Sequence, residues 1–241
     1  MSLVWNGQPV PGTERVISFL DDPTLPNWAK RQKRRSQGRK RKAGEHVDGC
    51  GIHTFRAMRQ PLVPYDPAAH RLRARECIRI HAGSGRAGSY HLYVDHDGQI
   101  YQCADPFVTI AYHGAANTYC VGIGITQGSR RTPRSAPDTA VTTNAVDAAA
   151  WLVETLWPLV SPADRTISFA GWKPGPMTSK GTRKIVRQRI PDDVLRRLFD
   201  LPGGIVIGHC HPGRKTHDPG EHVWARLGAR PGWRQVWPEA A

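Results

Sequence analysis

The stretch SYHLYVDHDGQIYQCAD, residues 89–105, decides the fold class of this chain. Apolar and polar side chains alternate over residues 90–95, which is the period of a β-strand with one buried face. Asp97 and Gly98 then offer the positive φ angles of a tight turn, and a second apolar run follows over residues 100–103. The stretch therefore predicts a β-hairpin.

Other segments with a clear pattern lie on both sides of this hairpin. The expected buried strands are 47–54, 120–126 and 204–208, and the expected helices are 68–83, 144–157 and 191–203. We expect Asn144 to begin the second helix and Pro158 to end it, because proline cannot donate a helical hydrogen bond. Strands interspersed with helices predict an α/β fold, in which a single domain has a central mixed β-sheet flanked by helices.

The chain of 241 residues is long enough for one sizeable domain and a small appendage. We assign residues 1–46 to an N-terminal extension that ends in a basic linker, and residues 47–241 to the domain itself. Residues 1–29 are too irregular to assign to helices or strands. Within the domain, residues 172–190 are rich in Lys, Arg, Gly and Pro, and we expect them to form an insertion.

The formal net charge of +14 indicates a polyanionic partner, which could be nucleic acid, anionic lipid or an anionic cell envelope. Much of the charge lies in KRQKRRSQGRKRK, residues 30–42, which has no apolar stripe and is expected to be solvated and mobile. The run has no interleaved aromatic residues and belongs to no nucleic-acid-binding module. We therefore expect no specific binding of nucleic acid.

No apolar run reaches the roughly 18 residues that a transmembrane helix needs, and the N-terminus lacks the pattern of a signal peptide. The odd number of cysteines, without close pairs, argues against a disulfide framework and for reduced thiols in a cytosol. They are Cys50, Cys77, Cys103, Cys120 and Cys210. We expect small buried hydrophobic side chains at these positions, and a cytoplasmic protein.

The motif GHCHPGRKTHDPG, residues 208–220, concentrates groups that can bind a metal ion. A catalytic zinc ion needs about three protein ligands and one open position. His209 follows a buried strand, and the glycine- and proline-rich loop after it can bring Asp218 back to the same point. The chain has no CxxC pair, and Cys210 is expected to point away from His209, which argues against a structural zinc site.

Five motifs in order carry a family resemblance: GIHT, GSYHLYVDHDGQIYQ, AYHGAAN, VGIGI and GHCHPGRKTHDPG. The chain resembles the zinc-dependent N-acetylmuramoyl-L-alanine amidases over roughly residues 47–227. That family includes the bacteriophage lysozyme-type amidases and the peptidoglycan recognition proteins. The resemblance implies a peptidoglycan amidase fold, a Zn²⁺ cofactor and peptidoglycan as the partner.

The resemblance also implies roles for single residues. The positions that match are His53, His209 and Asp218 as zinc ligands, Tyr90 and Lys215 as catalytic groups, and His113 and Asn117 in the substrate groove. Tyr90 corresponds to a tyrosine beside the nucleophilic water. Lys215 corresponds to a basic residue that faces the developing oxyanion.

Two ligand assignments have alternatives. His81 follows an alternating apolar pattern like the one before His53, and His217 stands beside Asp218. We prefer His53 because Thr54 after it resembles the strand end in the family, and Asp218 because the following Pro-Gly fits the family motif. We expect His81, His91, His96 and His211 otherwise to be surface or hydrogen-bonded core histidines. Gly124 occupies the position where several members of the family carry a glutamate, so no glutamate base is evident.

The resulting hypothesis is a zinc-dependent hydrolase that cleaves the amide bond between N-acetylmuramic acid and L-alanine, as a phage endolysin or a bacterial wall hydrolase does. A peptidoglycan-binding protein without catalysis is the alternative. We expect a monomer that stays in the cytoplasm until it is released to the cell wall. Residues 30–42 are expected to adhere to anionic envelope polymers such as teichoic acids or lipopolysaccharide.

Overall fold

The computed structural model describes residues 2–20, 40–56, 74, 78, 90–110, 116, 118–127, 141–162, 164–181, 186, 188–200, 204–212 and 218–236. The strands are β1 (Val4–Trp5), β2 (Gln8–Pro9), β3 (Val16–Ser18), β4 (Gly49–Arg56), β5 (Leu92–Val94), β6 (Ile100–Gln102), β7 (Cys120–Gln127), β8 (Ile167–Phe169), β9 (Ile205–Gly208) and β10 (Trp233–Gln235). The helices are α4 (Thr143–Val160), α5 (Asp192–Phe199) and α6 (Glu221–Gly228).

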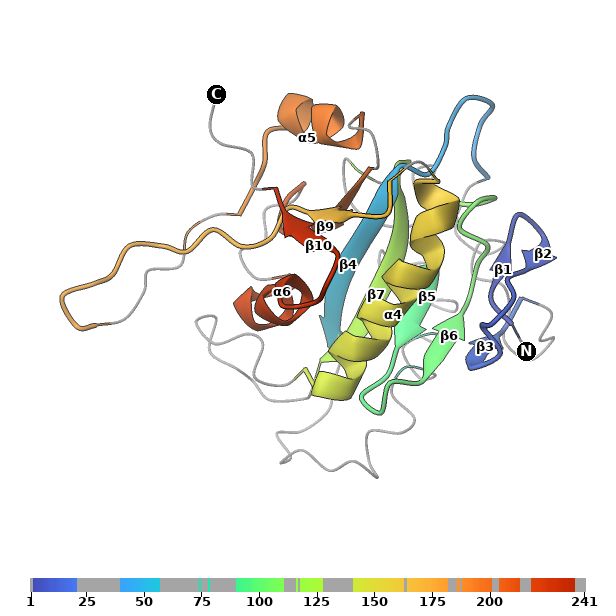
Figure 1. Ribbon diagram of the computed structural model, residues 1–241, viewed down its shortest axis with the longest axis horizontal. Coiled ribbons are helices and arrows are strands. Elements are labelled where there is room, and N and C mark those ends of the chain that lie inside the picture. Colours follow the sequence, from blue (N-terminus) through green and yellow to red (C-terminus); the bar gives the residue numbers. More distant parts are fainter. Residues whose placement is uncertain are drawn as a thin grey trace.

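One eight-stranded sheet, in the order β10-β8-β9-β4-β7-β5-β6-β3, forms the centre of the molecule (Figure 1). Only β5 and β6 pair antiparallel within it, and all other neighbours are parallel. Strands β1 and β2 form a separate antiparallel pair. The predicted fold class, a single α/β domain with a central mixed sheet flanked by helices, is confirmed.

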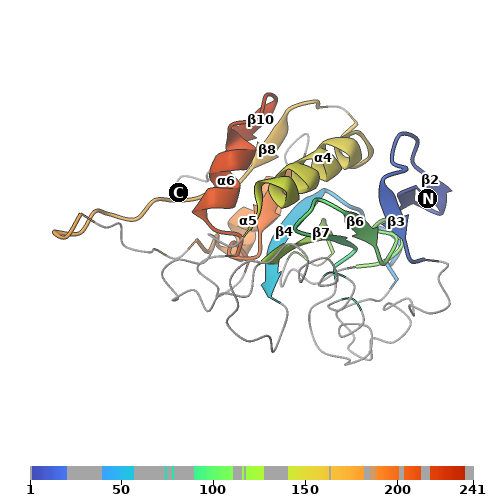
Figure 2. The same cartoon turned by 90° about the horizontal axis from the view of Figure 1, so that it is seen from below.

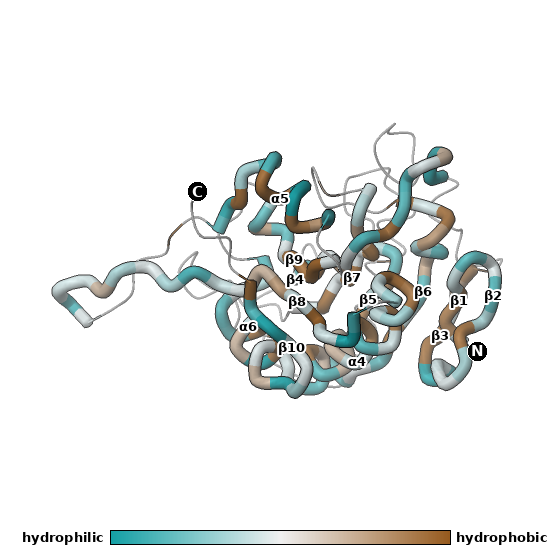
Figure 3. Tube along the Cα trace, turned by 45° about the horizontal axis from the view of Figure 1, so that its top comes forward, coloured by the Kyte–Doolittle hydropathy of each residue, from teal (hydrophilic) through white to brown (hydrophobic). Residues whose placement is uncertain are grey.

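Helices cover both faces of this sheet (Figure 2). Helices α4 and α6 bury their apolar side chains against one face, in a core that includes Ile52, Ile123 and Val206. On the other face α5 packs Leu195 and Phe199 against β9. Figure 3 shows the hydrophobic trace concentrated where the strands cross the centre of the molecule. Burial of this apolar surface is the main source of stability of such a domain.

Helix α4 departs from the prediction at both ends. Thr142 is the N-cap, and its side chain accepts a hydrogen bond from the Ala145 N–H at 3.2 Å, so the helix begins one residue before Asn144. The prediction that Pro158 ends the helix is wrong. The last turn continues to Val160 and is closed by the Ser161 N–H, which donates to the Trp157 carbonyl.

The hairpin formed by β5 and β6 is confirmed, but its turn differs from the prediction. Gly98 has the expected positive φ, of 86°, whereas Asp97 does not have a positive φ. The Asp97 side chain instead accepts a hydrogen bond from the Gln99 N–H at 2.9 Å. An acidic side chain that bonds a backbone N–H two residues ahead stabilises a turn without a left-handed backbone.

Strand β4 and the N-terminal segment extend the sheet beyond the expected elements. We predicted that the first strand of the domain ends at Thr54, but β4 continues to Arg56 because all of its residues pair with β7. Strand β3 pairs in parallel with β6 and forms one edge of the sheet. The segment expected to precede the domain therefore contributes a strand to the central sheet.

The basic run 30–42 lies outside the described residues except for its last three. Here the expectation of a solvated, mobile segment does not hold for Arg41. Its side chain donates to the carbonyls of Pro106 and Thr118, and its N–H donates to the Val108 carbonyl at 2.8 Å. The end of the run is thus held on the domain by bonds to backbone carbonyls.

The described cysteines are free and buried, as expected. Burial raises the pKa of the Cys50 thiol to about 12, so this side chain acts as a small hydrophobic group. Cys77 lies outside the described residues. No helix within the described part of the chain is long and apolar enough to cross a bilayer.

His91 is a hydrogen-bonded core histidine, as predicted. Its Nδ1 accepts from the Gly122 N–H at 2.8 Å, and its Nε2–H donates to the Thr109 carbonyl at 3.0 Å. Burial lowers its pKa to about 3; the positive charge of Arg41 adds to this shift, and the bond to Thr109 opposes it. The folded protein therefore keeps this imidazole neutral.

We predict that His91 makes the protein less stable in mild acid. Between pH 6.5 and about 3, His91 is protonated in the unfolded chain but neutral in the folded chain. The free energy of unfolding therefore falls as the pH falls, by up to about 1.4 kcal/mol per pH unit from this residue. A His91→Gln variant, whose amide can also accept and donate, should lose less stability between pH 6 and pH 4 than the wild type. Urea unfolding at several pH values measures this, with exposed His46→Gln as the control. Equal slopes in the His91→Gln variant and the wild type would contradict the assignment.

Candidate metal centre

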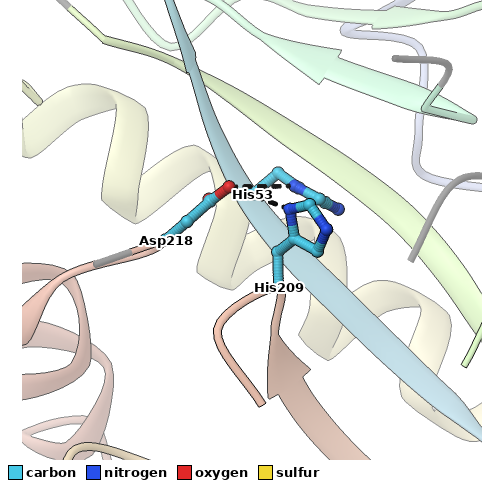
Figure 4. Close-up of side chains that lie close together, drawn as sticks. All are labelled: His53, His209 and Asp218. Atoms are coloured by element: carbon cyan, nitrogen blue, oxygen red, sulfur yellow. Dashed lines mark hydrogen bonds and ion pairs between the residues drawn. The ribbon is translucent and has the colours of Figure 1, made fainter. Parts of the chain in front are cut away.

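Three buried side chains from separate parts of the sequence meet at one edge of the sheet (Figure 4). His53 lies in β4, His209 directly follows β9, and Asp218 lies in the loop before α6. Each offers one ligand atom, and these atoms lie within 4.8 Å of one another. These are the residues predicted to bind zinc, and the structure brings them together.

The parallel pairing of β4 with β9 places the two imidazoles side by side. Ile52 is in register with Gly208, the last residue of β9, so His53 of β4 lies beside His209, at the carboxyl end of β9. Side chains alternate between the faces of a strand, and Ile52 points into the core beneath α4. His53 therefore lies on the opposite face, where its ring centroid is 4.1 Å from that of His209.

Asp218 is held against both histidines by hydrogen bonds to the backbone. Its Oδ1 accepts from the Thr54 N–H at 2.6 Å, and its carbonyl accepts from the Cys210 N–H at 2.8 Å. Its Oδ2 lies 3.3 Å from Nδ1 of His53 and 3.1 Å from Nδ1 of His209. One carboxylate oxygen thus fixes the side chain while the other faces the imidazoles.

These separations fit a tetrahedral metal ion. Zinc bonds to nitrogen and oxygen are about 2.0–2.2 Å long, so two ligand atoms on one tetrahedral ion lie roughly 3.4 Å apart. The distances of 3.3 and 3.1 Å from Oδ2 of Asp218 to the two histidine nitrogens are close to this value. Two imidazoles and one carboxylate are also the ligand set of catalytic zinc sites, which keep a fourth position open. The residues present therefore fit zinc.

His211 fixes the turn that carries His209. Its Nδ1 accepts from the Gly208 N–H at 2.9 Å, and its Nε2–H donates to the Gly171 carbonyl at 3.1 Å. Burial lowers the pKa of His211 to about 4, against the raising effect of the bond to Gly171. It is a hydrogen-bonded core histidine, as predicted, and its neutral tautomer is set by these two bonds.

Tyr90 and Gly124 lie next to His53. The Tyr90 ring is buried, and its centroid is 4.6 Å from that of His53. Gly124 of β7 is in register with His53 of β4 and with Tyr93 of β5. The position at which several members of the family carry a glutamate is thus next to a candidate ligand, and here it has no side chain.

Several predicted site residues lie outside the described residues. They are Lys215, His113 and Asn117, together with the alternative ligands His81 and His217. Thr54 is a site residue that sequence reasoning missed as a hydrogen-bond donor. Its contribution comes from the backbone N–H, and a backbone donor leaves no signal in the residue type.

A comparison with protein families gives a match, and it includes the three candidate ligands. Residues 52–221 match the family model described as N-acetylmuramoyl-L-alanine amidase. No match was found among curated proteins.

Similar solved structures include peptidoglycan recognition proteins. PGRP-LB from Drosophila is 17% identical, with 92% of this chain and 96% of that chain covered and a TM-score of 0.44. PGRP-SA from the bumblebee is 15% identical, with 91% and 96% covered and a TM-score of 0.47. These likenesses support no transfer of activity to this chain.

We predict that Asp218→Asn lowers the affinity for zinc by at least about 100-fold, because the neutral amide removes the anionic ligand from between the imidazoles. The amide oxygen can still accept from the Thr54 N–H, so the loop should keep its position. Zinc binding to the purified variant, measured by competition with a chelating dye, checks this. The control is Asp97→Asn at an exposed turn, which loses the same charge. Equal zinc affinity in both variants would show that Asp218 is no ligand.

Proposed function

The chain belongs to the N-acetylmuramoyl-L-alanine amidase family, and we propose that it hydrolyses the amide bond between N-acetylmuramic acid and L-alanine in peptidoglycan, with zinc as its cofactor. The observation that carries this proposal is the meeting of His53, His209 and Asp218 at ligand distances on one edge of the sheet. The family match covers all three residues.

The ligand set suits amide hydrolysis. A zinc ion held by these residues would polarise the scissile carbonyl and lower the pKa of a water from about 15.7 to about 7. Two neutral imidazoles and one carboxylate neutralise only part of its charge. The bonds from Thr54 and Cys210 to Asp218 hold the carboxylate in place, so the ligands need not reorganise during the reaction.

The remaining chemistry falls to residues beside the ligands. Gly124 provides no carboxylate next to His53, so we assign the orientation of the attacking water or of the substrate to the Tyr90 hydroxyl. We assign the stabilisation of the oxyanion to Lys215, an effect worth roughly 3–4 kcal/mol for a preorganised donor. His113 and Asn117 are proposed to line the substrate groove.

The proposed setting is the cell wall. We propose an enzyme of the endolysin or wall-hydrolase type, which reaches peptidoglycan after release from the cytoplasm. The basic run 30–42 would then adhere to anionic envelope polymers through long-range attraction, which weakens as salt rises.

Release of L-alanine amino groups from purified sacculi tests the proposed reaction. With zinc supplied, the wild type should liberate new amino termini on L-alanine and lower the turbidity of the sacculi. The Asp218→Asn variant should do neither, while exposed-site Asp97→Asn should match the wild type. A folded, zinc-loaded wild type that binds sacculi but liberates no amino groups would instead identify a peptidoglycan-binding protein without catalysis.

A second prediction concerns the Tyr90 hydroxyl. Tyr90→Phe keeps the ring against His53 but removes the hydroxyl, so kcat should fall by about 100-fold while zinc affinity stays the same. Steady-state kinetics with a soluble muropeptide and zinc titration measure the two quantities. Tyr119→Phe, which keeps its ring stacked on Phe199, is the matched control and should retain full activity. An unchanged kcat in Tyr90→Phe would remove this residue from the mechanism.

A further inference from the structure

Residues 172–181 leave the sheet after β8 and run far from the body of the molecule (Figures 1 and 2). They begin the segment 172–190, which is here called the basic arm. It contains six Lys or Arg residues and no Asp or Glu. The structure describes residues 172–181, 186 and 188–190 of it. Figure 3 shows that its trace is largely hydrophilic. The described part of the arm is therefore a projecting cationic element.

The base of the basic arm is fixed by specific hydrogen bonds. The side chain of Gln188 is buried, accepts from the Lys173 N–H at 2.7 Å and donates to the Lys173 carbonyl at 2.8 Å. A buried amide that bonds both backbone groups of a residue across the arm holds its two ends together. The arm thus leaves the domain at a defined place and in a defined direction.

The same base is tied to the loop of the candidate metal centre. The Nε2–H of His211 donates to the Gly171 carbonyl, and its own carbonyl accepts from the Ile190 N–H at 2.9 Å. His211 therefore bonds the chain on both sides of the arm, and it lies two residues after the candidate ligand His209. These two bonds join the arm base to the turn that carries His209.

The basic arm emerges at the edge of the sheet that carries the metal centre. Strands β8, β9 and β4 are parallel, so their carboxyl ends lie at one edge. His53 and His209 lie at this edge, and the arm begins shortly after Phe169, the last residue of β8. The base of the arm and the candidate ligands therefore lie at the same edge of the sheet.

The cations of the basic arm are available to an anionic polymer. Lys180 lies in the turn Thr178–Gly181, which is closed by a bond from the Gly181 N–H to the Thr178 carbonyl at 3.0 Å. Lys173 and Lys180 are exposed, whereas Arg189 lies 3.4 Å from Asp192. Without acidic residues in the arm, their field attracts anions.

We propose that the basic arm is a second binding surface for polymeric peptidoglycan, on which Lys173 and Lys180 hold carboxylates of stem peptides adjacent to the one being cleaved. The proposal rests on the proposed function, because it takes the polymer to be the substrate. Stem-peptide carboxylates recur along the glycan and are covalently joined to the scissile unit. A small muropeptide has no such neighbours, so the arm should favour the polymer over the fragment.

The test compares two variants that lose the same charge. Lys173→Gln/Lys180→Gln removes the exposed cations of the basic arm, and Arg165→Gln/Arg234→Gln removes two exposed cations elsewhere. At low salt the arm variant should bind purified sacculi about five-fold more weakly than the control in a sedimentation assay, and the difference should vanish near 1 M salt, where the Debye length is about 3 Å. Its KM on sacculi should rise by a similar factor, with kcat and the hydrolysis of a soluble muropeptide unchanged.

The binding assay needs no catalysis, so it separates this proposal from the proposed function. Equal binding of sacculi by the two variants would overturn the role of the basic arm whether or not the protein hydrolyses peptidoglycan. Binding to sacculi from which the attached phosphate polymers have been removed shows whether the basic arm binds those phosphates or the peptide carboxylates. A binding defect that persists on stripped sacculi and disappears after amidation of the peptide carboxyls supports the proposal. A defect seen only while the phosphate polymers are attached would overturn it.

Discussion

The Thr54 N–H donates to Oδ1 of Asp218 at 2.6 Å, and this bond joins the loop after β9 to β4. The rest of the centre depends on it, because it turns Oδ2 toward the two imidazoles. It requires that β4 and β9 run parallel and in the register that pairs Ile52 with Gly208. A shift of one residue would move His53 to the face that packs beneath α4. The sheet register, rather than the loop alone, therefore sets the geometry of the ligands.

The electrostatics of the centre follow from burial. His53 and Asp218 are almost completely buried, and a buried carboxylate is costly unless it is paired or hydrogen-bonded. The Asp218 carboxylate accepts a hydrogen bond from a backbone N–H and lies against two imidazoles. These partners stabilise the buried carboxylate, and the same arrangement can bind a cation. The buried side chains of His91 and His211 avoid the cost of a buried charge in another way. Each has both ring nitrogens hydrogen-bonded to backbone groups and stays neutral. Hydrogen-bond partners thus distinguish the structural histidines from the candidate ligands.

The sequence predicted the elements whose signal is local. The hairpin around Gly98 and the apolar face of α4 are confirmed, because turn chemistry and helical periodicity need no tertiary information. Strands β3, β8 and β10 were not predicted: they are as short as β5 and β6 but lack the tight turn that marks those two as a hairpin. Helix α6 was also missed: α5 has the same length but begins after Pro191 with two acidic residues, whereas α6 begins directly after the glycine- and proline-rich motif 208–220. The pairing of β3 with β6 depends on distant contacts, which is why the N-terminal segment was expected to lie outside the domain.

The two faces of β4 show how one strand serves both stability and chemistry. Cys50 and Ile52 point into the core beneath α4, and His53 points to the other face, where its ring meets that of His209. A strand buried on both faces is usually apolar throughout, so a histidine on one face needs partners that offset the loss of solvent. Those partners come from the loop after β9, and His211 ties the same loop to the base of the basic arm. The turn that carries His209 is therefore also the turn that bonds the base of the basic arm.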